Sequence, residues 1–236
     1  MQAALRHWFA QWGLPDQLRV DNGPPWGSWG DLPPELALWV LGLGVSVHWK
    51  RPRHSRDNAV IERAHGVCQA WVEPATCPDA ATLQARLEWA TTTQREHYPS
   101  RAGPSRLAAA PALAHSGRSY DPTQEAAQWD VHRVWAALAE GRWPRQVDKV
   151  GRISLYNRAI RVGRPWAGRT VSVQLAVRAG QPHWHIRAAD GSALAMAPAP
   201  ELTREPIVTL EVLHRRHPTP HGGKPRAPPG AQPYSR

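Results

Sequence analysis

The hydrophobic pattern of this 236-residue chain changes its period near residue 141, and this change constrains the fold more than any other feature. Before it, apolar residues recur at helical spacing in segments 2–13, 34–43, 60–72, 79–97 and 123–140, with short strands at 17–20 and 45–49. After it, runs near period two cover 151–156, 159–162, 170–177 and 183–188, separated by glycine-bearing turns. The pattern predicts an α/β part rich in helices, followed by a small all-β barrel or sandwich.

The charge changes at the same place. Residues 1–140 carry 13 Lys and Arg against 14 Asp and Glu, whereas residues 141–236 carry 16 against 5, a net charge of +11. A compact basic region attracts polyanions, and arginines that bind phosphates make DNA affinity depend on salt. DNA is therefore the predicted partner, although a GC-rich genome would also produce an excess of arginine. Residues 214–236 have almost no apolar content and are predicted to be a disordered basic tail.

Cysteine usage and hydropathy exclude several classes of protein. Cys68 and Cys77 form no CxxC pair, so neither a disulfide framework nor a zinc site is indicated. No apolar run approaches the roughly 20 residues that span a bilayer, and the N-terminus lacks the pattern of a signal peptide. We expect a cytoplasmic, DNA-associated protein with no membrane partner.

Two carboxylates, Asp21 and Glu62, are candidate catalytic residues because of their positions in the predicted elements. Asp21 ends the strand 17–20 and is followed by Asn22 and Gly23, which shape the exit turn; Glu62 lies on a helix that Asn58 can cap. Each is weak evidence alone, because Asp-Asn-Gly is an ordinary turn and a glutamate on a polar helix face is usually solvated. His65 shares the face of Glu62, where it can bond that carboxylate, touch DNA or remain solvated.

A basic loop precedes this helix and is a candidate DNA contact, with a merely solvated charged loop as the alternative. Its residues are Lys50, Arg51, Arg53, His54 and Arg56.

The order of these features is more specific than any one of them. A strand, Asp-Asn-Gly, a helix, a strand, a basic loop and a helix with Asn-x-x-x-Glu-Arg-x-His-Gly follow one another within residues 1–110. This part resembles the catalytic core of the retroviral integrase and insertion-sequence transposase superfamily, which has a ribonuclease-H-like fold. The resemblance implies that Asp21 and Glu62 are the second and third catalytic carboxylates, supported by Asn22, Gly23, Asn58 and His65. It also implies two Mg²⁺ ions, hard cations that prefer oxygen ligands and promote in-line displacement at phosphorus.

The same resemblance implies that a part of the site is missing. The family's first catalytic Asp lies on the first of three strands, and residue 1 here corresponds to the helix after them. We therefore expect a partial ribonuclease-H-like core at 1–110 that is inactive alone, with an intact transposase or further copies of the chain on DNA ends as partners. A helical connector is expected at 111–140.

The segment 150–158 and the strands after it resemble the small β-domain that follows the core in many bacterial transposases, which implies DNA contact by residues 141–213. Trp166 and Trp184 are expected in its core. The candidate DNA-binding arginines are Arg63, Arg152, Arg158, Arg161, Arg164 and Arg169. The predicted function is DNA transposition or integration by two-metal phosphoryl transfer, and the alternative is DNA binding without chemistry through the basic β-domain.

Overall fold

The computed structural model describes residues 1–27, 30–51, 59–99 and 102–213, and it has a mixed α/β fold. The predicted helices and strands of the first 50 residues are confirmed, with small shifts at their ends. They are helix α1 (Gln2–Trp12), strand β1 (Gln17–Val20), helix α2 (Glu35–Gly42) and strand β2 (Ser46–Trp49).

Strands β1 and β2 form a parallel pair, with Gln17 opposite Ser46 and Val20 opposite Trp49. Parallel strands need a crossover connection, and α2 lies within it. This helix is apolar nearly all round and is correspondingly buried, with Leu38 and Trp39 fully inaccessible. Because the strands are parallel, the chain leaves both of them at the same end of the pair.

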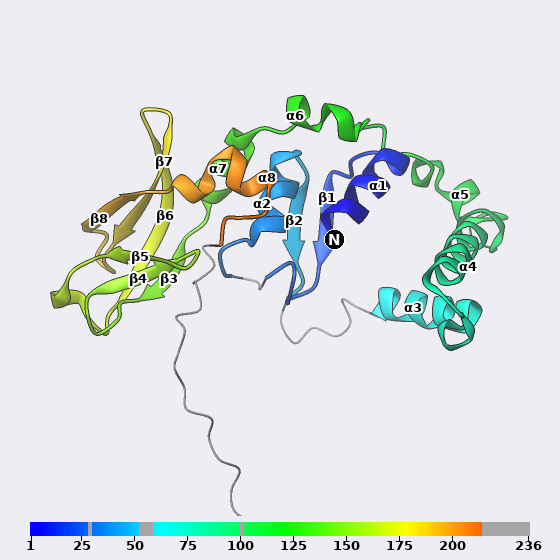
Figure 1. Ribbon diagram of the computed structural model, residues 1–236, viewed down its shortest axis with the longest axis horizontal. Helices are drawn as coiled ribbons and strands as arrows, with labels where there is room; N and C mark the ends of the chain where they lie inside the picture. The colour runs from blue at the N-terminus through cyan, green and yellow to red at the C-terminus, as the bar shows by residue number, and fades with distance from the viewer. Residues whose placement is uncertain (28–29, 52–58, 100–101, 214–236) are drawn as a thin grey trace, which may run out of the picture.

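The helical segments that follow are α3 (Ala59–Val72), α4 (Ala80–Thr92), a π-helical turn η3 (Thr93–His97) and the short α5 (Arg106–Ala109). Two 3₁₀ turns, η2 (Pro74–Thr76) and η4 (Pro111–Leu113), flank them. Figure 1 shows α3, α4 and α5 together at one end of the molecule, beyond α1 and opposite the end that carries the β-sheet. Among the described residues from 61 to 110, only Val72, Ala90 and Ser105 are buried, so this unit has a small core.

The single helix predicted over 123–140 is wrong, because the chain breaks it at Trp129. The structure has η5 (Pro122–Gln124), α6 (Glu125–Gln128) and α7 (Val131–Glu140), and the Asp130 side chain caps α7 by accepting from the His132 amide at 2.9 Å. The Trp129 indole packs against Gly42, where a Cβ would lie 2.1 Å from the ring, and donates to the Trp39 carbonyl at 2.9 Å. Burial of this indole fixes the break.

The C-terminal part contains the four predicted strands and two more. The predicted ones are β4 (Arg152–Leu155), β5 (Arg158–Arg161), β6 (Thr170–Arg178) and β7 (Gln181–Arg187); the additional ones are β3 (Trp143–Gln146) and β8 (Ala193–Pro198). Both sheets here are antiparallel: an open four-stranded sheet in the order β3-β6-β7-β8, and a separate β4–β5 hairpin. In the part of the chain that is described, these strands do not close into one barrel. Trp184 is fully buried, as predicted, and Trp166 is partly buried against the core.

One hydrophobic cluster runs from the N-terminal helices to the sheet, from Leu5 to Val212. In Figure 1, α7 and α8 (Arg204–Val208) lie between the four-stranded sheet and the β1–β2 pair. Trp135 Nε1 donates to the Leu202 carbonyl at 2.8 Å, and the Tyr156 hydroxyl donates to the Pro33 carbonyl at 2.8 Å. These contacts join the two parts that the sequence distinguishes near residue 141. The predicted domain limits stay a prediction. The predicted tail 214–236 lies outside the described residues.

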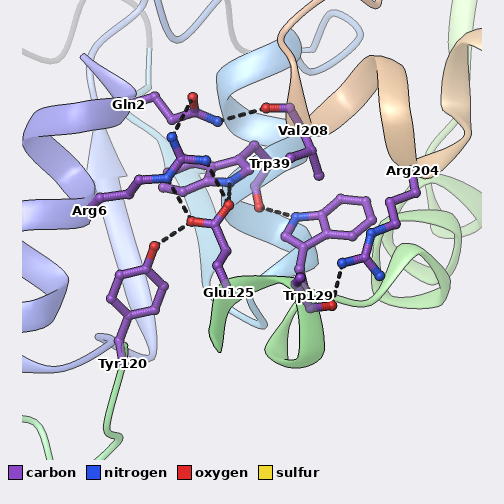
Figure 2. A network of polar contacts seen from close by, with 9 residues as sticks. Gln2, Arg6, Trp39, Tyr120, Glu125, Trp129, Arg204 and Val208 are labelled. Atoms are coloured by element: carbon purple, nitrogen blue, oxygen red, sulfur yellow. Dashed lines mark hydrogen bonds and ion pairs between the residues drawn. The ribbon is translucent and has the colours of Figure 1, made fainter. Parts of the chain in front are cut away.

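A buried carboxylate adds a polar tie between distant segments (Figure 2). Glu125 accepts from Arg6 Nε and Nη2, each at 2.7 Å, from Trp39 Nε1 at 3.1 Å, and from the Tyr120 hydroxyl. Burial alone would raise the pKa of the Glu125 carboxyl, but the hydrogen bonds from Arg6, Tyr120 and Trp39 outweigh it, so the pKa is lowered. The same carboxylate raises the pKa of the Arg6 guanidinium by accepting from it. Glu125 thus connects α1, α2 and the segment that leads to α7.

Candidate functional site

The predicted catalytic Asp21 lies directly after β1, at the end of the parallel pair where β2 also ends. Lys50 follows β2, and its ammonium is 3.0 Å from Asp21 Oδ1. The Lys50 side chain is only 7% exposed, whereas that of Asp21 is 71% exposed. Asn22 Nδ2 donates to the Lys50 carbonyl at 2.8 Å and so holds the two strand exits together. The parallel register therefore brings Asp21, Asn22 and Lys50 into one place.

The turn after Asp21 has the shape that the sequence predicts. Gly23 adopts φ +142°, a conformation that favours glycine, and its carbonyl accepts from the amides of Trp26 and Gly27. Trp49 Nε1 donates to the Trp26 carbonyl at 2.6 Å, which fixes the turn against β2. The carboxylate is thus carried by an ordered turn.

Glu62 and His65 are exposed on α3. Helix α3 packs against α4 and stands apart from β1 in Figure 1. The predicted cap Asn58 and the loop residues Arg53, His54 and Arg56 lie outside the described residues.

The arrangement does not fit a Mg²⁺ site by itself. No group of three or more His, Cys, Asp or Glu side chains able to hold a metal occurs within the described ranges. A divalent cation at Asp21 would have to displace the Lys50 ammonium from the carboxylate, and Glu62 belongs to α3, which stands apart from β1 in Figure 1. Mg²⁺ stays a prediction from the resemblance, and no metal-dependent step follows from the described geometry.

The β4–β5 hairpin gathers the predicted basic residues of the C-terminal part. Arg152 and Arg161 are direct cross-strand partners, and both are exposed. The next cross-strand pair along the hairpin, Ile153 with Ile160, faces the other side, and both isoleucines are buried in the core. The alternation places the two arginines opposite each other on the outer face, and like charges directly opposite each other cost energy unless an anion is bound.

Two further predicted arginines flank the hairpin and are exposed. Arg164 starts the 3₁₀ turn η6 (Arg164–Trp166), and the Arg169 guanidinium lies 5.2 Å from the centre of the Trp166 ring. An aromatic face orients a guanidinium without neutralising its charge. Arg164 and Arg169 therefore extend the basic surface around Arg152 and Arg161.

Arg158 has a different role from the one that the sequence suggests. Its guanidinium pairs with the buried Glu201 carboxylate and donates to the Pro198 carbonyl at 3.1 Å. Glu201 also accepts from Trp184 Nε1 at 2.8 Å. Arg158 thus neutralises a buried charge and links the hairpin to the end of β8. Its role in the described structure is to stabilise the fold, and DNA binding is not needed to explain it.

A pocket of about 590 Å³ lies between α3, η3 and α5. Arg63 lines it and was a candidate DNA-binding residue, but sequence reasoning missed its other lining residues, Trp71, Gln94, Tyr98 and Arg106 among them. Ser105 caps α5 by accepting from the Ala108 amide at 3.1 Å. That Ser cap, which places Arg106 at the start of a helix, was the available signal.

Comparison with protein-family models gives no match to this chain. Membership in the integrase and transposase superfamily therefore stays a proposal that depends on the chain's own residues. Within the described part of the chain, no helix is long and apolar enough to cross a membrane.

Proposed function

We propose that this chain is a DNA-binding protein of a DNA transposition or integration system, with a ribonuclease-H-like core within residues 1–110 and its principal DNA contact on the β4–β5 hairpin. The pairing of Arg152 with Arg161 carries the proposal. Two exposed arginines that are direct cross-strand partners, next to a buried isoleucine pair, offer a site for an anion that spans both. The phosphate backbone of DNA supplies such an anion.

The surrounding charges favour the same ligand. Residues 141–213, the described β-part, contain 11 Lys and Arg against 5 Asp and Glu. One of the acidic residues, Glu201, is buried and paired with Arg158, so it does not offset the exposed arginines. The excess positive charge lies at the surface, where it attracts a polyanion.

Catalysis is the second candidate, and the order of the elements favours it. Strand β1, Asp21, α2, β2 and α3 follow one another as the superfamily resemblance expects. Helix α3, which carries Glu62, stands apart from β1 in Figure 1, and Asp21 is paired with Lys50; both observations argue against chemistry by this chain alone. We therefore propose DNA binding as the activity of the isolated chain and strand transfer only in an assembly that completes the site.

The test measures how single arginines contribute to phosphate binding. Fluorescence anisotropy of a labelled duplex is recorded over a series of salt concentrations for the full chain and for Arg152→Gln and Arg161→Gln. Each variant should reduce the slope of log K against log salt by about 0.9, the value for one phosphate contact. Arg19→Gln, which removes an exposed positive charge from β1, is the matched control and should leave the slope unchanged. Equal slopes in all four proteins would refute the hairpin as the DNA contact.

A further inference from the structure

The pocket between α3, η3 and α5 has one aromatic wall. Trp71 from α3 and Tyr98, directly after η3, have ring centroids 5.6 Å apart at an interplanar angle of 54°. Tyr98 is 45% exposed, although it stands against another aromatic ring. Trp89 of α4 contacts Trp71 at a centroid distance of 6.0 Å but does not line the pocket. Part of two aromatic rings is thus held in place and accessible from the pocket.

The same pocket has cationic groups from two elements. Arg63 projects from α3 and Arg106 from α5, and both are exposed residues that line the cavity. Arg106 Nη1 donates to Gln94 Oε1 at 3.3 Å, so this guanidinium is partly oriented by the amide that lies beside it in the lining. No carboxylate is among the lining residues of the described pocket. A ligand with negative charge is therefore favoured.

Aromatic rings, guanidinium groups and an amide are the groups that bind a nucleotide. A base stacks on aromatic rings whatever its sequence, and an arginine fork binds phosphate through two parallel hydrogen bonds. The volume of about 590 Å³ lies within the range of about 300–1,000 Å³ that is typical of small-molecule sites. Inside a duplex, paired and stacked bases cannot reach such a pocket, whereas an unpaired nucleotide can.

We propose that this pocket binds one unpaired nucleotide at the end of a DNA duplex. The base lies against Trp71 and Tyr98, the Gln94 amide faces its edge, and Arg63 and Arg106 bind the adjoining phosphates. The identity of the polymer as DNA rests on the proposed function, but the pocket adds a preference that the basic hairpin does not provide. The hairpin binds phosphates along any duplex, and the pocket selects an end with an unpaired base.

The experiment compares two labelled duplexes that differ only at one end, which is blunt in one and carries unpaired 3′ nucleotides in the other. Anisotropy titrations at constant low salt give the affinity of the full chain for each. The chain should bind the duplex with the overhang about 5- to 10-fold more tightly, in line with the stacking of one base. Tyr98→Leu and Arg106→Gln should each remove most of this preference and leave the affinity for the blunt duplex unchanged. Trp89→Leu is the control, because it alters the same aromatic cluster outside the pocket lining and should keep the preference.

Each outcome decides between the two proposals. Equal affinity of the unmodified chain for both duplexes would overturn the pocket assignment and leave the proposed DNA-binding function intact. A loss of preference in Trp89→Leu as large as that in Tyr98→Leu would also overturn it, since the effect would then come from the packing of the helices. Failure to bind either duplex would refute the proposed function and, with it, the inference that rests on it.

Discussion

Replacing Glu125 with glutamine removes the charge from the network of Figure 2 with little change of shape. The carboxylate accepts four hydrogen bonds from three side chains, those of Arg6, Trp39 and Tyr120. An amide offers one oxygen and turns two N–H donors toward groups that are themselves donors. At least one buried donor of Trp39 or Tyr120 then loses its acceptor, which costs about 1–3 kcal/mol.

The loss of the ion pair adds less. The Arg6 side chain is 33% exposed, so water can hydrate its guanidinium after the substitution, and this part should cost no more than about 1 kcal/mol. We expect a total of about 3 kcal/mol in the free energy of unfolding for Glu125→Gln. In a chain of this size, that loss corresponds to a decrease of roughly 6–12 °C in Tm.

Because the pKa of Glu125 is lowered, the effect of the substitution on stability should also depend on pH. A carboxyl whose pKa is lower in the folded state stabilises the fold above its ordinary pKa of about 4.3, and loses that effect as the pH falls through the folded-state value. The difference between the unmodified chain and Glu125→Gln should therefore be full at neutral pH and shrink at acid pH.

Urea unfolding followed by circular dichroism at neutral and acid pH measures both the loss of stability and its dependence on pH. Glu88→Gln is the matched control: Glu88 is exposed on α4 and accepts from Gln84, so its substitution should change stability by no more than about 0.5 kcal/mol. Equal stability of Glu125→Gln and the unmodified chain at neutral pH would refute the reasoning, as would a difference that stays constant into acid.

Three further predictions concern other polar groups. Glu201→Gln should destabilise the chain by about 3 kcal/mol in urea unfolding, because a buried carboxylate that accepts from Arg158 and Trp184 is lost. Burial raises the pKa of the Tyr156 hydroxyl, so its stabilising effect is present below about pH 10 and lost as the pH rises further; Tyr156→Phe should flatten the decline of stability in urea titrations at alkaline pH. The purified chain with Mg²⁺ should not join DNA ends on a denaturing gel; a joined product that disappears in Asp21→Asn would contradict the prediction.

Local sequence signals correctly predicted the elements that are determined by residues close together in the sequence. Asp21-Asn22-Gly23 indicates the end of a strand through turn chemistry, and the structure has that turn. The predicted helix over 123–140 was wrong because the burial of Trp129 against Gly42 is a contact between distant segments, which periodicity does not record. Strands β3 and β8 were missed because one contains Pro144 and the other is rich in alanine; both are edge strands, where a proline is tolerated.

In the candidate site, too, the sequence predicted neighbouring residues but not contacts between distant segments. The sequence indicates that Arg152 and Arg161 lie in neighbouring strands, and the register that makes them direct partners follows from the tight turn between those strands. No residue near Arg158 in the sequence indicates that it forms an ion pair with Glu201, 43 residues away. The pocket was missed because its walls come from α3, η3 and α5, three elements that are separate in the sequence.

The most direct test of the central claim is the affinity of the unmodified full chain for duplex DNA as a function of salt concentration. Contacts to phosphates by the four exposed arginines Arg152, Arg161, Arg164 and Arg169 predict a slope of roughly −3 to −4 in log K against log salt. Affinity should then fall on the order of 100-fold between about 50 and 200 mM salt. A lack of binding at low salt, or an affinity that does not change with salt, would contradict DNA binding through the hairpin.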